Sequence, residues 1–128
     1  MVGLGTARPK LSHLGADGAI LLTGGRQRNR GTSDITAWLN IVGDGLDWVP
    51  YSITDWHNRL APPGLPTYPP GVNSTVEVCG GCGWTSTYTS ILRLDHEPGV
   101  AVLVYDRCDT QLCNKGQDIF AVRIELVM

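Results

Sequence analysis

The chain has 128 residues, with 10 Lys and Arg, 12 Asp and Glu, and a net charge of −2, which fits one domain at most. This balance leaves no basic stripe, so we do not expect nucleic acid or an anionic membrane surface as a partner. The longest apolar run, Val100 to Tyr105, has the length of a strand, and no membrane span is predicted. Sixteen Gly, eight Pro and a single Phe indicate short strands joined by many turns.

Two segments share one strand–turn–strand pattern. Residues 10–14 and 19–23 flank a turn at 15–18, and residues 90–94 and 100–105 flank a turn at 96–99. A repeated hairpin is typical of propeller blades. The two copies superpose at a constant offset of 81, which places Leu11 on Leu92, Gly18 on Gly99, Leu22 on Leu103 and Arg26 on Arg107.

Further strands are predicted at 37–42, 74–78 and 119–126, the last with the alternation of a half-buried outer strand. No helix is predicted. Residues 62–71 hold five Pro and two Gly and are predicted to be loop. We therefore expect an all-β fold with one blade at about 10–51, a loop-rich connection at 52–87 and a final blade at 88–128.

Several segments, in order along the chain, resemble the C-terminal blades of the sialidase (neuraminidase) superfamily. They are Gly24-Gly25-Arg26, Trp38-Leu39-Asn40, the Asp-box-like turn (BNR repeat) Gly43 to Trp48, Thr85 to Ile91, Leu103 to Asp106 and Gln117 to Val122. The resemblance implies about two blades of a six-bladed β-propeller.

That resemblance also implies site residues. The family uses a Tyr nucleophile activated by a Glu, because a carboxylate would be repelled by the carboxylate of sialic acid. Arginines grip that carboxylate. Tyr88 matches the nucleophile, Arg26 and Arg59 match carboxylate-binding arginines, and Asp106 matches an acid that orients an arginine. Without the resemblance, Tyr88 reads as a core tyrosine and the charged residues as solvated side chains.

Departures from the family pattern argue against hydrolysis by this chain alone. Arg8 stands where the resemblance places the activating Glu, and no acidic residue precedes Asp17. A cation cannot accept the proton of a phenol. Ile41 and Gly43 replace the Ser and Asp of the Asp-box turn. We therefore expect a fragment of a retaining exo-α-sialidase that is inactive by itself, or alternatively a non-catalytic carbohydrate-binding or scaffolding β-domain.

The four cysteines form a second group of candidate site residues, separate from those of the sugar site. The hairpin topology brings the pair Cys79 and Cys82 and the pair Cys108 and Cys113 to the same rim. Two disulfides, a zinc ion held by four thiolates, and free thiols all remain open. Zinc is the one cofactor that this pattern suggests. Either zinc or the disulfides would make the chain a small zinc- or disulfide-stapled β-module. The three histidines, His13, His57 and His96, are scattered and are given no ligand role.

The expected partner is a sialylated or related acidic glycan. Two blades leave open sheet edges, which predicts oligomers. Residues 1–5 lack the charged flank and apolar core of a signal peptide, and we favour an extracellular location for the complete protein.

Overall fold

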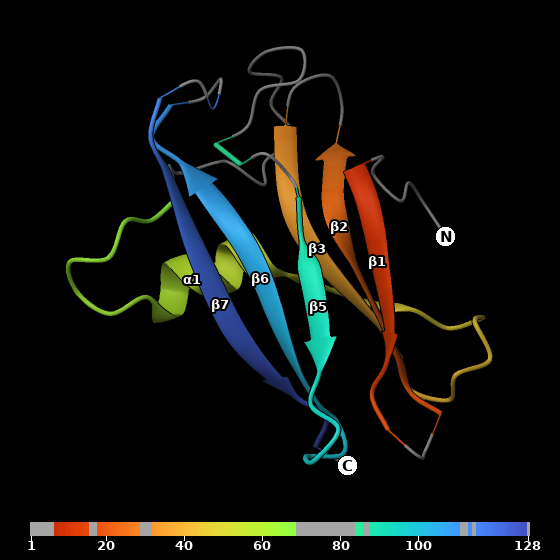
Figure 1. Ribbon diagram of the computed structural model, residues 1–128. Coiled ribbons are helices and arrows are strands. Elements are labelled where there is room, and N and C mark those ends of the chain that lie inside the picture. Colours follow the sequence, from red (N-terminus) through yellow and green to blue (C-terminus); the bar gives the residue numbers. More distant parts are fainter. Residues whose placement is uncertain are drawn as a thin grey trace.

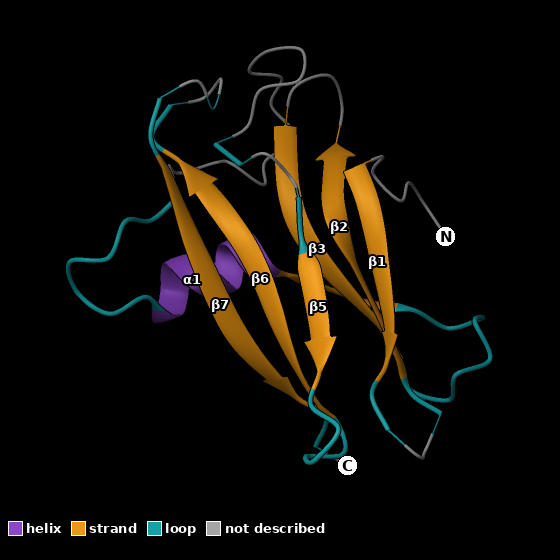
Figure 2. Ribbon diagram, viewed as in Figure 1, coloured by secondary structure: helices purple, strands orange, loops and turns teal. Residues whose placement is uncertain are grey.

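The computed structural model describes residues 7–15, 18–28, 32–68, 84–85, 88–110, 113 and 115–127. These residues form two antiparallel sheets and a short helix (Figure 2). The expected all-β class is therefore confirmed at the level of β-rich architecture, while the expected strand at 74–78 lies outside the described residues. The elements are β1 (Ala7–His13), β2 (Ile20–Arg28), β3 (Thr32–Asn40), β4 (Val49–Ser52), α1 (Ile53–Leu60), β5 (Ser90–Arg93), β6 (Val100–Cys108) and β7 (Gln117–Glu125).

The first sheet is a simple meander in the order β1-β2-β3-β4. The turn between β1 and β2 contains Gly18 at φ +80°, a conformation that glycine adopts without steric cost. The turn between β3 and β4 is held by Asp44, whose Oδ1 accepts hydrogen bonds from the Leu46 amide at 2.9 Å and Asn40 Nδ2 at 3.0 Å. The Trp48 indole donates to the Gly45 carbonyl at 2.9 Å. The segment from Gly43 to Trp48 thus forms an ordered turn in which the Asp44 carboxylate accepts two hydrogen bonds.

The second sheet has the order β5-β6-β7 and begins with the second copy of the hairpin. Its turn glycine, Gly99, has the same φ of +80° as Gly18. The registers differ by one residue, however. Leu22 lies opposite Leu11, whereas its equivalent Leu103 lies opposite Ile91. The structural match of Leu11 is therefore Ile91, and the sequence match to Leu92 is wrong by one position because the second turn is one residue longer.

The prediction that the chain has no helix is also wrong, because residues Ile53–Leu60 form α1. Ser52 caps α1, and its hydroxyl accepts a hydrogen bond from the Asp55 amide at 3.1 Å. Ile53, Thr54 and His57 face the interior. The Thr54 hydroxyl accepts a hydrogen bond from the Ile35 amide at 3.1 Å, which ties the helix to β3. No helix in the described part of the chain is long and apolar enough to cross a membrane.

The two sheets meet along their first strands. β1 and β5 lie side by side and run in the same direction, and the later strands extend away behind them (Figure 1). The Thr23 and Thr89 hydroxyls are 3.0 Å apart across this contact, and the Gly99 amide donates to the Leu14 carbonyl at 2.5 Å. A single core fills the space between the facing sides of the sheets. Its largest aliphatic members, Leu14, Leu21, Ile35 and Leu103, are fully buried, and each contributes about 2 kcal/mol to folding.

Candidate functional site

Three of the four residues predicted for sugar chemistry lie toward one end of the two sheets, the upper end in Figure 1; Arg59 does not. β2 and β6 finish at this end, while β1 and β5 start there. Arg26 lies in the last part of β2, Asp106 in the last part of β6, and Tyr88 two residues before β5. Three segments far apart in sequence therefore contribute their predicted site residues to one end of the fold.

Tyr88 is half-exposed at this end, with 52% of its surface accessible. Its neighbour Thr89 is buried and contacts Thr23 between the sheets. Because successive side chains of an extended strand point to opposite faces, Tyr88 points to the outer face of the β5–β7 sheet. Continuing the register of β5 with β6, in which Ser90 lies opposite Val104, brings Tyr88 level with Asp106.

Asp106 is buried, with 2% of its surface exposed. The Thr85 hydroxyl donates to its Oδ1 at 2.5 Å, and the Gln117 amide donates to its Oδ2. These neutral donors fix the orientation of the carboxylate in a dry environment. The neighbouring Arg107 turns elsewhere, donating to the Thr67 carbonyl at 2.6 Å and pairing with Asp109 and Asp118.

The two predicted arginines are placed differently. Arg26 belongs to β2, opposite Asp34 on β3, and its side chain lies outside the described part of the structure. Arg59 lies on the exposed side of α1, with its Nε 3.3 Å from the Asp55 carboxylate. The helix covers the inner side of the sheets, whereas Tyr88 points to the outer face. The structure therefore does not bring Arg59 to Tyr88.

Two of the four cysteines lie in the described part of the chain. Cys108 and Cys113 form a disulfide, which follows the end of β6 at the upper end of the fold. A disulfide-bonded pair cannot supply thiolate ligands, so this finding argues against the four-thiolate zinc site. In the part of the chain that the structure describes, no group of three metal-binding side chains is present. Cys79 and Cys82 lie outside the described residues.

His57 has a structural position that the sequence did not indicate. It is buried on α1, and its ring packs edge-on against Tyr68, Tyr105 and Phe120. Its two nitrogens contact the Tyr105 hydroxyl and the Pro66 carbonyl. His13 and His96 are exposed. The absence of a local signal is expected, because these contacts join segments far apart in the sequence; His57 and Tyr105 alone are 48 residues apart.

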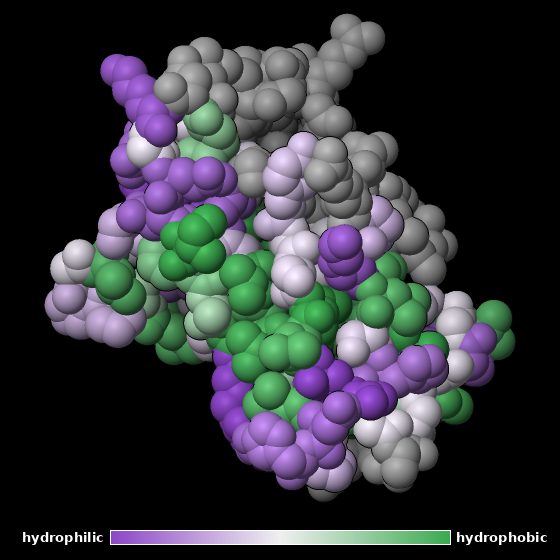
Figure 3. All heavy atoms as spheres, viewed as in Figure 1, coloured by the Kyte–Doolittle hydropathy of each residue, from purple (hydrophilic) through white to green (hydrophobic). Residues whose placement is uncertain are grey.

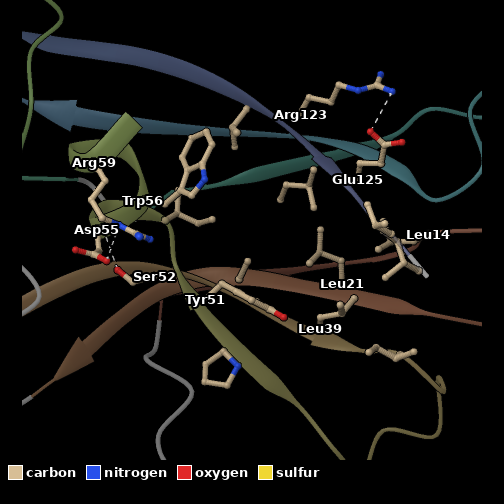
Figure 4. A pocket seen from close by; sticks show the side chains of 18 residues that line it. Leu14, Leu21, Leu39, Tyr51, Ser52, Asp55, Trp56, Arg59, Arg123 and Glu125 are labelled. Carbon is tan, nitrogen blue, oxygen red and sulfur yellow. Dashed lines mark hydrogen bonds and ion pairs between the residues drawn. The ribbon is translucent and has the colours of Figure 1, made fainter. Parts of the chain in front are cut away.

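A groove of about 610 Å³ opens between the two sheets on the side of β4 and β7 (Figure 4). Its floor is apolar, with Leu21 and Leu39 from the first sheet and Ile124 from the second. Trp56 of α1 points into it, and Tyr51 lies along the opposite wall. Charged residues form its rim, where Asp55 pairs with Arg59, and Arg123 pairs with Glu97 and lies 4.0 Å from Glu125. The volume lies in the range of small-molecule pockets. Of the residues that line this groove, Arg59 is the predicted site residue.

Searches against protein-family models, curated proteins and solved structures found no match to this chain, so its function has to be argued from its own residues.

Proposed function

We propose that the chain is a piece of a sialidase-like β-propeller, that its upper end binds an acidic sugar of the sialic acid type, and that this piece alone binds without hydrolysing. In a complete enzyme of this type, Tyr88 would attack the anomeric carbon and Arg26 would hold the carboxylate.

The arrangement of the sheets supports the propeller part of the proposal. Neighbouring blades of a propeller are up-and-down sheets whose first strands line a common axis. Here β1 and β5 are each the first strand of such a sheet, lie side by side and run in the same direction (Figure 1). The Thr23–Thr89 contact joins β2 of the first sheet to the segment that leads into β5 of the second.

The main support for binding of an acidic sugar is the position of Tyr88. Its ring is half-exposed at the end of the sheets where β1 begins and β2 finishes. These strand ends contain Arg8 and Arg26. Guanidinium groups bind carboxylates with two parallel hydrogen bonds, and an aromatic ring packs against the apolar face of a sugar. Tyr88 and these two strand ends lie at the same end of the sheets, and a site there that combines the ring with arginines would suit an anionic sugar.

The same residues argue against hydrolysis. A phenol needs a base to accept its proton before it can act as a nucleophile. Arg8 is the second residue of β1, and it occupies the sequence position where the resemblance puts the activating glutamate. An arginine side chain is permanently charged, so it can assist binding of a carboxylate but cannot serve as the base.

The proposal is tested by calorimetric titration of the purified chain with N-acetylneuraminic acid, which measures the binding affinity. Neutral galactose is the control sugar. Arg26→Ala and Tyr88→Ala are each expected to weaken binding about tenfold or more, because each removes a direct contact. Arg93→Ala is the matched control, since Arg93 ends β5 at the opposite end and pairs with Asp95. Equal affinity for both sugars, or equal losses for Arg26→Ala and Arg93→Ala, would refute the proposal.

Hydrolysis is tested separately with a sialoside that releases a fluorescent alcohol. We expect no release above the uncatalysed rate. Release that disappears in Tyr88→Phe would instead favour a working sialidase.

A further inference from the structure

The groove between the two sheets is not part of the proposed sugar site. It has a volume of about 610 Å³ and opens between the last strands of the two sheets, β4 and β7 (Figure 4). Tyr88, in contrast, points to the outer face of the β5–β7 sheet. The groove is therefore a separate candidate site, and its volume is typical of pockets that hold a small molecule.

The floor of the groove is aliphatic along its length. Leu21 and Leu39 line it from the first sheet. Val122, Ile124 and Leu126 line it from the second sheet and the residue that follows β7. From Val122 to Leu126 an extended chain advances about 13 Å. A narrow aliphatic surface of this length suits an extended alkyl chain.

Helix α1 contributes a tryptophan and an arginine to one end of the groove. Trp56 points into the groove, and Arg59 lies at its rim (Figure 4). Residues three apart are neighbours on the surface of a helix. A cationic group therefore lies next to the apolar wall at this end.

The Arg59 guanidinium has donors that the described residues do not use. Its Nε lies 3.3 Å from the Asp55 carboxylate, in an exposed pair of a kind that contributes little to stability. Among the described residues, Asp55 is its only ion-pair partner, and the guanidinium donates no hydrogen bond to them. Two parallel N–H groups of a guanidinium match the two oxygens of a carboxylate. Arg59 can therefore bind the carboxylate of a ligand.

The other two charged residues that line the groove face away from its floor. Arg123 and Glu125 project from the opposite side of β7, as the alternation of side chains along a strand requires (Figure 4). Arg123 is also paired with Glu97 at 2.6 Å. Of the charged lining residues, only Asp55 and Arg59 thus lie at the end where Trp56 enters the groove.

We propose that this groove binds a free aliphatic carboxylic acid of medium chain length. The carboxylate pairs with Arg59, and the alkyl chain runs along the floor from Trp56 toward Leu126. Removal of the alkyl chain from water supplies most of the affinity, and the contact with Arg59 sets the direction in which the chain lies. This ligand and this site are independent of the sugar proposed above.

Binding is tested by calorimetric titration of the purified chain with octanoate and decanoate. Decanoate should bind about fifteenfold more tightly than octanoate, because it buries two more methylene groups. The alcohol 1-octanol lacks the charge and should bind about tenfold more weakly than octanoate, and octylamine should bind no better than 1-octanol. Absence of decanoate binding, or equal affinities of octanoate, 1-octanol and octylamine, would overturn the proposal.

The role of Arg59 is tested by substitution. Arg59→Ala should lower the affinity for octanoate to that for 1-octanol and should leave the affinity for 1-octanol unchanged. Arg93→Ala is the matched control, since Arg93 ends β5 and pairs with Asp95. Equal losses of octanoate affinity in the two variants would contradict a contact between the carboxylate and Arg59.

The position of the alkyl chain is tested on the two sides of β7. Apolar side chains also gather on the outer face of β5–β7, which is a competing place for an alkyl chain (Figure 3). Ile119 is 65% exposed on that face, whereas Ile124 of the same strand lines the groove. Ile124→Ser should weaken decanoate binding about tenfold, and Ile119→Ser should leave it unchanged. The reverse order would place the chain on the outer face and overturn the proposal.

Tryptophan fluorescence locates the ligand without a substitution in the aliphatic floor. Decanoate should shift the emission of the wild type. Trp56→Phe should lose this shift, and Trp48→Phe, on the turn between β3 and β4, should retain it. Excess N-acetylneuraminic acid should not displace decanoate, because Tyr88 and the groove lie on different sides of the second sheet. A shift that survives in Trp56→Phe, or displacement by the sugar, would place decanoate elsewhere and overturn the proposal.

Discussion

Nδ1 of His57 lies 2.8 Å from the hydroxyl of Tyr105, and this contact joins α1 to the middle strand of the second sheet. The other ring nitrogen, Nε2, lies 2.9 Å from the Pro66 carbonyl oxygen. A carbonyl can only accept, so Nε2 carries the proton, and in the neutral ring Nδ1 accepts from Tyr105. One imidazole thereby connects the helix, the loop that follows it and β6.

The first prediction concerns this histidine. His57→Ala leaves the Tyr105 hydroxyl and the Pro66 carbonyl without their buried partner and removes a ring packed against three aromatic side chains. We expect a loss of about 2–4 kcal/mol in the free energy of unfolding, measured by urea denaturation. His96→Ala, at an exposed turn, should change it by less than about 0.5 kcal/mol. Equal effects of the two substitutions would contradict the structural role of His57.

The second prediction concerns alkaline pH. Burial raises the pKa of Tyr105 from 10.0 to about 12. The unfolded chain therefore releases this phenolic proton at a lower pH than the folded chain does. The contribution of the neutral Tyr105 phenol to the free energy of unfolding is fully present below pH 10 and is lost between about pH 10 and 12. Over this interval the urea midpoint of the wild type should fall more than that of Tyr105→Phe. Tyr51→Phe, at an exposed position, should follow the wild type, and parallel curves for all three chains would disprove the assignment.

The third prediction separates the disulfide from the zinc site. Since Cys108 and Cys113 are bonded to each other, the purified chain should contain no stoichiometric zinc by elemental analysis, and a chelator should not change its melting temperature. The double variant Cys108→Ala/Cys113→Ala should lose about 1–3 kcal/mol of stability. One zinc ion per chain, with a melting temperature that falls on chelation, would show that the four cysteines act as ligands instead.

The strands were largely predictable because their signals are local. Both hairpins were expected from alternating or continuous apolar runs around glycine-containing turns, and the structure places β1–β2 and β5–β6 there. The alternation in β7 also corresponds to its observed pattern of burial. The one-residue error between Leu92 and Ile91 arose because a constant offset assumes equal turn lengths.

The helix was missed because its sequence is a poor helix former. Residues 53–60 include β-branched, aromatic and Asn residues, and the helix has only eight positions. Ser52 followed by Asp55 was a usable capping signal. The burial of His57 was not predictable, because its contacts with Tyr68 and Phe120 exist only after the sheets have assembled. The groove beside Trp56 arises in the same way, from the placement of α1 between two sheets.

The fourth prediction concerns the turn between β3 and β4. Hydrogen bonds from the Leu46 amide and then from Asn40 hold the pKa of Asp44 below its usual value of 3.8. The charged carboxylate therefore stabilises the fold fully above pH 3.8, and this contribution is lost as the pH falls through the lowered pKa. Asp44→Ala should lower the urea midpoint at pH 7 and should flatten the decline below pH 4 relative to the wild type.

Asp47→Ala is the control for Asp44. The backbone carbonyl of Asp47 accepts a hydrogen bond from Asn40 Nδ2 at 3.0 Å. This carbonyl is still present after substitution of the side chain. The Asp47 variant should therefore keep a midpoint close to that of the wild type at pH 7. If Asp47→Ala destabilised the chain as much as Asp44→Ala, the effect would come from the charge of the turn rather than from the hydrogen bonds of Asp44.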